Sequence, residues 1–112
     1  MSFWHRKSTL LSAALPQVAV ELTELLTATG RHELAAQVPF LSIVDRCRCG
    51  DDFCATIYTQ PKPNGSWGPK LECIDLDAER GAIILDVVDG RIATIEILNR
   101  DELREKLLMI MP

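Results

Sequence analysis

The sequence predicts an α+β fold in which a mostly antiparallel sheet of about five strands packs against helices from both ends of the chain. Apolar residues recur at helical spacing before residue 38, alternate with polar residues over most of 40–98, and return to helical spacing over 99–110. At 112 residues the chain has the size of one compact domain. We therefore expect a single domain (1–112) with a helical amino-terminal part (1–38), a sheet (40–98) and a carboxy-terminal helix (99–110).

The amino-terminal helical part is predicted by apolar residues that recur every three or four positions along one face, namely Leu11, Leu15, Val18, Leu22 and Leu25. Pro16 interrupts the pattern. Either a short helix ends near Leu15, or the main helix begins there with Pro16 in its first turn, where no N–H is needed. Gly30 is the expected end of the helix, and a short helical turn over 31–37 ends before Pro39 because a residue that precedes proline disfavours helical geometry.

Five segments with strand-like patterning follow. They are Phe40–Cys49, Phe53–Thr59, Leu71–Leu76, Ala82–Val88 and Arg91–Leu98. The segment 60–70 holds three prolines and two glycines, which indicates a loop. The last helix begins after Asn99, a residue type that often caps helices, and places Leu103, Leu107 and Ile110 on one face.

The last hairpin admits two registers. A two-residue Asp89–Gly90 turn pairs Ile83 with Glu96 and mixes charged and apolar residues on both faces. A three-residue loop over 88–90, with Gly90 left-handed in a bulge, is favoured because it gathers one apolar face from Ile83, Leu85, Val87, Ala93, Ile95 and Ile97. The opposite face is then only half solvated and carries Asp86, Thr94 and Glu96 among Ile84, Val88 and Ile92. It is either partly covered or a contact surface.

Four cysteines are the sequence feature most suggestive of chemistry. Cys47, Cys49 and Cys54 lie within the run Cys-Arg-Cys-Gly-Asp-Asp-Phe-Cys, and Cys73 follows about twenty residues later. Four thiolates can hold a structural zinc ion, although Cys-x-Cys departs from the usual Cys-x-x-Cys spacing. Zinc is therefore one candidate cofactor, and the alternative is four buried thiols without a cofactor.

The register of the cysteine hairpin separates these two interpretations. A four-residue loop over 50–53 places Cys47, Cys49 and Cys54 on one face, where they share a metal. A three-residue loop over 50–52 builds an apolar face that includes Phe53 and Ile57 and sends Cys54 to the other side, with Arg46 and Arg48. We favour the second arrangement because it buries more apolar surface.

Charge and aromatic residues suggest where a partner binds. The formal net charge is −4, which argues against a nucleic-acid binder, and residues 71–105 alone hold ten acidic residues against four arginines. An acidic face complements a basic protein partner, so Asp75, Asp77, Asp86 and Glu96 are candidate contact residues. Two aromatic side chains in or beside the loop, Tyr58 and Trp67, are further candidates, with Trp67 either anchoring a partner or folding back over the sheet.

The compartment is expected to be cytoplasmic. Arg6 and Lys7 precede an apolar stretch, but this stretch is short and interrupted by Pro16, unlike a signal peptide. No run approaches the length of a membrane span, so no membrane association is expected. Cytosolic thiols remain reduced.

The run Arg46-Cys-Arg-Cys-Gly-Asp-Asp-Phe-Cys-Ala55, the loop and the segment Gly81-Ala-Ile-Ile-Leu-Asp-Val-Val-Asp-Gly-Arg-Ile-Ala-Thr-Ile-Glu-Ile-Leu98 resemble small proteobacterial proteins of unassigned function. The last hairpin is similar to that of the YuzE-like family. This resemblance brings no catalytic residues, and no catalytic motif is recognisable. By analogy of size and character, we expect a non-enzymatic protein-binding module of the immunity or antitoxin kind, which neutralises a bacterial toxin as in contact-dependent growth inhibition. The alternative is a small zinc protein that uses the four cysteines.

Overall fold

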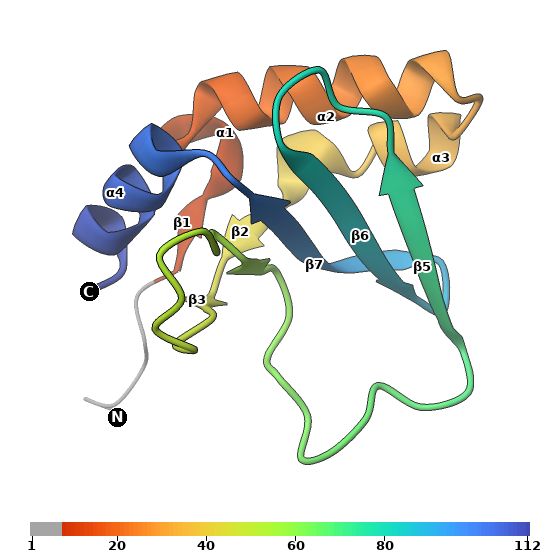
Figure 1. Cartoon of the computed structure of the whole chain (residues 1–112). Helices are drawn as coiled ribbons and strands as arrows, with labels where there is room; N and C mark the ends of the chain where they lie inside the picture. The colour runs from red at the N-terminus through yellow and green to blue at the C-terminus, as the bar shows by residue number, and fades with distance from the viewer. Residues whose placement is uncertain (1–7) are drawn as a thin grey trace.

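The computed structural model describes residues 8–112, so Arg6 and Lys7 lie outside the described part. Its main feature is a five-stranded antiparallel sheet with the order β3-β4-β7-β6-β5, which confirms the predicted α+β class. The sheet comprises β3 (Asp45–Arg46), β4 (Ile57–Tyr58), β5 (Leu71–Leu76), β6 (Ala82–Val88) and β7 (Arg91–Leu98). A second sheet pairs β1 (Thr9–Leu10) with β2 (Ser42–Ile43). Figure 1 shows the helices gathered on one side of the main sheet, with the loop between β4 and β5 hanging clear of them.

Both expectations for Pro16 are met in the amino-terminal part. Helix α1 (Leu11–Ala14) is short, and α2 (Pro16–Ala28) begins with the proline in its first turn, where its missing N–H leaves no bond unmade. Gly30 ends α2 in the left-handed conformation, and the Arg31 N–H returns to the carbonyl of Leu26. Helix α3 (His32–Ala35) and the 3-10 turn η1 (Val38–Phe40) follow.

The last hairpin has the predicted strands but a different turn. Asp89 and Gly90 form a two-residue turn, both with positive φ, and pair Val88 with Arg91. The pairing then shifts by one residue at Ala93, so that Ile83 lies opposite Ile97. The predicted three-residue loop is therefore wrong, and a bulge at Ala93 restores the apolar face that the loop was meant to explain. Ile92, and not Ala93, packs into the main core cluster.

The core lies between the helices and one face of the sheet. Leu85, Ile95 and Ile57 lie side by side across β6, β7 and β4, and none is exposed to solvent. Leu11, Leu22 and Leu26 of α1 and α2 and Leu107 of α4 (Asp101–Ile110) pack into the same cluster. Along β6 the buried residues alternate with half-buried ones, so a second face of the sheet remains outside this core.

Two predicted elements are wrong in detail. The strand Phe40–Cys49 is divided, because Phe40 belongs to η1 and is 82% exposed, while β2 and β3 pair with different neighbours. The strand Phe53–Thr59 shortens to β4, although Ala55 and Thr59 still donate to carbonyls of β7.

Asn99 does not cap α4. Arg100 stands at the N-cap position and no side chain caps the helix. Asn99 instead adopts a φ of +62°, and its N–H donates to the carbonyl of Phe53. This left-handed residue, for which Asn is well suited, turns the chain from β7 into α4.

Within residues 8–112, no helix combines the length and the apolar character that crossing a bilayer requires.

Candidate functional site

The cysteine hairpin adopts the register that the burial argument disfavoured. Asp45 lies opposite Tyr58 and Arg46 opposite Ile57, and the Cys47 N–H donates to the carbonyl of Thr56. When this pairing continues for two residues beyond Cys47 and Thr56, Cys49 lies opposite Cys54. The four residues 50–53 then form the loop between them. The favoured three-residue loop is therefore wrong.

The reason for this register lies in β7. Ile57 pairs with Ile95, and the Ala55 N–H donates to the carbonyl of Ile97, so β7 turns Ala55 and Ile57 into the core. Side chains alternate along a strand, and Thr56 and Cys54 must then face the other way. Phe53, which was expected in the core, is 46% exposed.

As a result, three thiols meet on the sheet face that the helices leave uncovered, which we call the open face. The ligand atoms of Cys47, Cys49 and Cys54 all lie within 4.8 Å of one another, and we call these residues the thiol cluster. Cys49 is exposed and the other two are half-buried, so the expectation of buried thiols is wrong. No further His, Cys, Asp or Glu joins the group among residues 8–112.

Cys73 does not belong to the thiol cluster. It lies on β5, the far edge strand of the sheet, where it is exposed and sits opposite Asp86. Its thiol donates to one carboxylate oxygen of Asp86 at 3.1 Å, and the Thr94 hydroxyl donates to the other at 2.8 Å. The four-cysteine zinc site expected from the sequence is therefore not assembled.

A hollow of about 330 Å³ adjoins the thiol cluster on the open face. The thiols share its wall with four residues that the sequence singled out as partner contacts, namely Tyr58, Trp67, Asp86 and Glu96. The sequence left two arrangements open for Trp67, one that anchors a partner and one that folds back over the sheet. Trp67 is half-buried, which agrees with the second. Asp75 and Asp77 are exposed and do not line the hollow.

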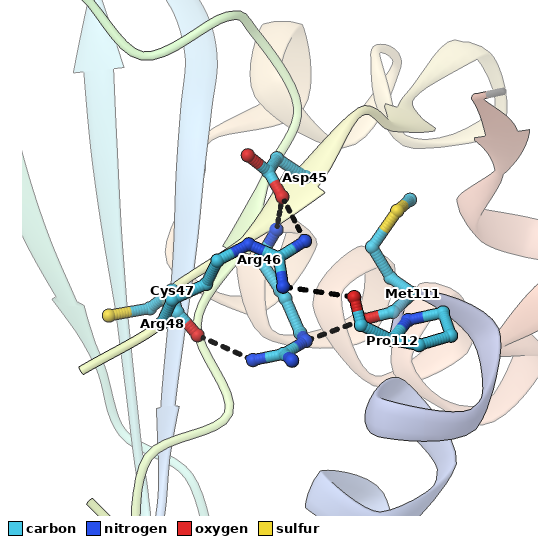
Figure 2. A network of polar contacts seen from close by, with 6 residues as sticks. All are labelled: Asp45, Arg46, Cys47, Arg48, Met111 and Pro112. Atoms are coloured by element: carbon cyan, nitrogen blue, oxygen red, sulfur yellow. Dashed lines mark hydrogen bonds and ion pairs between the residues drawn. The ribbon is translucent and has the colours of Figure 1, made fainter. Parts of the chain in front are cut away.

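Arg46 and Arg48 alternate with Cys47 and Cys49 along the hairpin. Their guanidinium groups reach the carboxy-terminal end of α4, where Arg46 Nε donates to the Met111 carbonyl at 2.5 Å and Arg48 donates to the main-chain oxygen of Pro112 at 2.9 Å. Figure 2 shows the Cys47 sulfur pointing away from these contacts. The arginines therefore tie the hairpin to the helix. Together with Arg104 they also line a smaller hollow of about 260 Å³, whose wall includes all three cysteines of the thiol cluster.

The pKa values of Cys54 and Cys49 shift in opposite directions. Burial acts to raise the pKa of Cys54, but hydrogen bonds from the Thr56 hydroxyl and backbone, and from Cys49 and Cys47, outweigh it and lower this pKa. For Cys49, a backbone hydrogen bond from Asp51 acts to lower the pKa, and bonds to the Cys47 and Cys54 thiols raise it to about 11. Cys54 therefore gives up its proton more readily than Cys49, because its thiolate accepts more hydrogen bonds.

Tyr58 stands on the open face beside the cluster. The pKa of Tyr58 is raised, first by burial and then by the nearby negative groups Cys47, Asp45, Cys54 and Asp86. Burial and negative charge therefore both disfavour the ionised form of Tyr58.

The sequence analysis missed Thr56, whose hydroxyl lies 3.3 Å from the Cys54 sulfur. Period-two alternation from Cys54 is the signal that places Thr56 beside the cluster, and it becomes readable once the four-residue loop is chosen.

A larger hollow of about 690 Å³ lies between α2 and α4. Six of its fourteen lining residues are apolar, and four of the charged ones form two ion pairs, Arg100 with Glu21 and Arg80 with Glu102. The chemistry of the molecule is therefore concentrated at the thiol cluster.

No protein-family model, no curated protein and no solved structure matches this chain.

Proposed function

We propose that this protein binds one thiophilic metal ion, with zinc as the reference ion, between Cys47, Cys49 and Cys54. The mutual approach of the three ligand atoms to within 4.8 Å carries the proposal. In a tetrahedral zinc site with Zn–S bonds of about 2.3 Å, two sulfurs lie about 3.8 Å apart. Small side-chain rotations therefore bring the cluster to coordinating geometry without moving the strands.

The surroundings of the cluster favour a bound cation. Thiolates are the ligands that soft ions and zinc prefer. The lowered pKa of Cys54 favours its thiolate, and protons that remain on the sulfurs are displaced when the ion binds. Asp86 and Glu96 add negative charge along the wall of the adjoining hollow.

This site is a binding site and not a catalytic one in our proposal. A catalytic thiol needs an adjacent base, and within residues 8–112 no histidine lines the hollow that the thiols share. The hydroxyl of Thr56 is the nearest polar side chain to Cys54, and a hydroxyl is a poor base. His5, the other histidine of the chain, lies outside the described residues.

Zinc binding is tested with reduced, metal-free protein titrated with zinc against a chromophoric chelator. We expect one equivalent per chain for the natural sequence and for Cys73→Ser, which removes a thiol outside the cluster. Cys47→Ser and Cys54→Ser are expected to weaken binding at least tenfold. Stoichiometry below half an equivalent, or equal losses for Cys73→Ser and Cys47→Ser, contradicts the proposal. Circular dichroism of each variant confirms that it is folded.

A second candidate function is protein binding through the open face, as in an immunity protein that neutralises a toxin. The observation that favours it is the grouping of Tyr58 and Trp67 with Asp86 and Glu96 around one hollow on a face without helices. Aromatic side chains supply large contact areas, and carboxylates attract a basic partner and speed its association.

The test for protein binding uses the product of the adjacent gene as the candidate toxin. The double variant Asp86→Asn with Glu96→Gln is expected to slow association and to reduce its dependence on salt. The control, Asp101→Asn with Glu105→Gln, changes the net charge equally but on exposed positions of α4. Equal effects of the two double variants, or no binding of the natural protein, would contradict protein binding through the open face.

A further inference from the structure

The thiol cluster supplies three sulfur ligands and lacks a fourth. Cys73 is the remaining cysteine, and three strand spacings separate β4 from β5 in the order β4-β7-β6-β5. At about 4.8 Å per spacing this distance is about 14 Å, far beyond the reach of a cysteine side chain. The Cys73 thiol is moreover engaged with Asp86.

Carboxylates do not complete the set either. Asp51, Asp86 and Glu96 line the same hollow as the cluster, yet within the described range 8–112 none of them brings an oxygen within 4.8 Å of all three sulfurs. The histidine of this range, His32, is exposed at the start of α3 and is not among the residues that line the hollow. Among residues 8–112, zinc, which requires four ligands, therefore finds three protein ligands at the cluster and leaves its fourth position to another donor such as water.

We propose that the cluster selects ions whose coordination is complete with three thiolates, represented by trivalent arsenic, over zinc. This inference rests on the proposed metal-binding function and names the class of ion. Trivalent arsenic forms three bonds in a pyramid, and its lone pair occupies the position where zinc needs a fourth ligand. Three sulfurs on one hairpin, without a fourth donor in the described part of the chain, match that requirement.

The binding reaction is an exchange of ligands without electron transfer. Arsenous acid, As(OH)₃, loses three As–O bonds and gains three As–S bonds. Each thiol gives its proton to a departing hydroxide, so three waters leave for one arsenic bound. The exposed Cys49 and the open hollow give the acid access from solvent.

The structure also predicts which thiols are consumed. The sulfurs of Cys47, Cys49 and Cys54 are bound in the complex and become resistant to alkylation. Cys73 is exposed and outside the cluster, so bound arsenic should leave its alkylation unchanged when labelling is done at a pH high enough to ionise its thiol. This pattern separates the trigonal site from adventitious binding to any pair of thiols.

The experiment titrates reduced, metal-free protein with arsenite under nitrogen and follows it by native mass spectrometry and by alkylation mapping. We expect one arsenic per chain, with a mass gain of one arsenic less three hydrogens, and protection of the cluster but not of Cys73. Cys49→Ser, which leaves two cluster thiols, should weaken binding at least tenfold, whereas Cys73→Ser should not change it. Added to zinc-loaded protein, equimolar arsenite should release the zinc to a chelator.

The outcomes distinguish this inference from the proposed function. If zinc binds with one equivalent and equimolar arsenite fails to displace it, the preference for three-coordinate ions is wrong while metal binding stands. If neither ion binds to folded protein, both proposals fail. If arsenite binds but protects Cys73 as well as two cluster thiols, the trigonal site is wrong.

Discussion

Arg100 and Glu21 form a bidentate ion pair that joins the start of α4 to α2 across 79 residues of sequence. Both nitrogen–oxygen distances are 2.5 Å, and Arg100 Nε also donates to the carbonyl of Arg80 at 2.9 Å. The Arg100 side chain is only 10% exposed, and the hydrogen bonds to Glu21 raise the pKa of its guanidinium. The pair therefore ties α2 to the segment before β6 and to the end of β7.

Removing the charge of Glu21 should destabilise the fold. In Glu21→Gln the mostly buried Arg100 guanidinium loses its carboxylate, and we expect a loss of about 1–3 kcal/mol in the free energy of unfolding, measured by urea denaturation. Glu102→Gln is the control, because Glu102 pairs with Arg80 on the surface and should cost much less. Equal losses in the two variants contradict a structural role for the buried pair.

Gly81 is the glycine that the fold tolerates replacing least. Its φ is +65°, and a Cβ at this position would lie 2.1 Å from the carbonyl oxygen of Leu98. We expect Gly81→Ala to lose about 3 kcal/mol or more, because both the backbone conformation and the space are unfavourable. At Gly90, φ is +79° but an added Cβ would meet no atom within 4 Å, so Gly90→Ala should lose about 1 kcal/mol. Thermal unfolding compares the two, and equal midpoints would show that the close approach to Leu98 has no effect.

Gln37 holds the turn of the last hairpin from outside the sheet. Its amide donates to the Gly90 carbonyl at 2.7 Å and accepts from the Ile92 N–H at 3.0 Å. Gln37→Ala should therefore cost about 1–2 kcal/mol and accelerate hydrogen exchange at the Ile92 amide. Gln17→Ala, on an exposed position of α2, is the control. Unchanged exchange at Ile92 would contradict this role.

Cys73 should react with alkylating reagents only at high pH. The hydrogen bond to the Asp86 carboxylate, with burial and nearby charge as smaller causes, raises the pKa of Cys73, and only the thiolate reacts. Asp86→Asn removes the charge that disfavours the thiolate, so the pH at which alkylation accelerates should move downward. Asp75→Asn removes a charge two residues from Cys73 on the same strand and should shift it less. Peptide mapping with iodoacetamide at several pH values measures this, and identical profiles for the two variants would overturn the assignment.

The sheet is the part of the fold that the sequence predicts best. The bounds of β5, β6 and β7 agree with the predicted strands because alternation of apolar residues is a local signal. The turn at Asp89 and Gly90 and the bulge at Ala93 were not separable from the sequence, since both arrangements place Ile83, Leu85, Ile95 and Ile97 on one face.

The sequence predicted which residue types form the candidate site, but it did not predict how they are arranged in space. The sequence identified Cys47, Cys49 and Cys54 and indicated that a four-residue loop brings them together. The other register was favoured because Phe53 and Ile57 were counted as core residues together. The structure keeps Ile57 in the core and leaves Phe53 partly exposed.

The chain by itself determines the α+β class, the strands from Leu71 onward and the residue types that can hold a soft ion, because these depend on neighbours in sequence. The tertiary structure decides the register of the cysteine hairpin, since β7 aligns Ile57 with Ile95 from 38 residues away. That single alignment turns three sulfurs to the open face, while the separate pairing of β5 with β6 places Cys73 at the far edge of the sheet. The choice between two registers depends on long-range pairing, and local patterns of apolar residues contain no information about which distant strand supplies it.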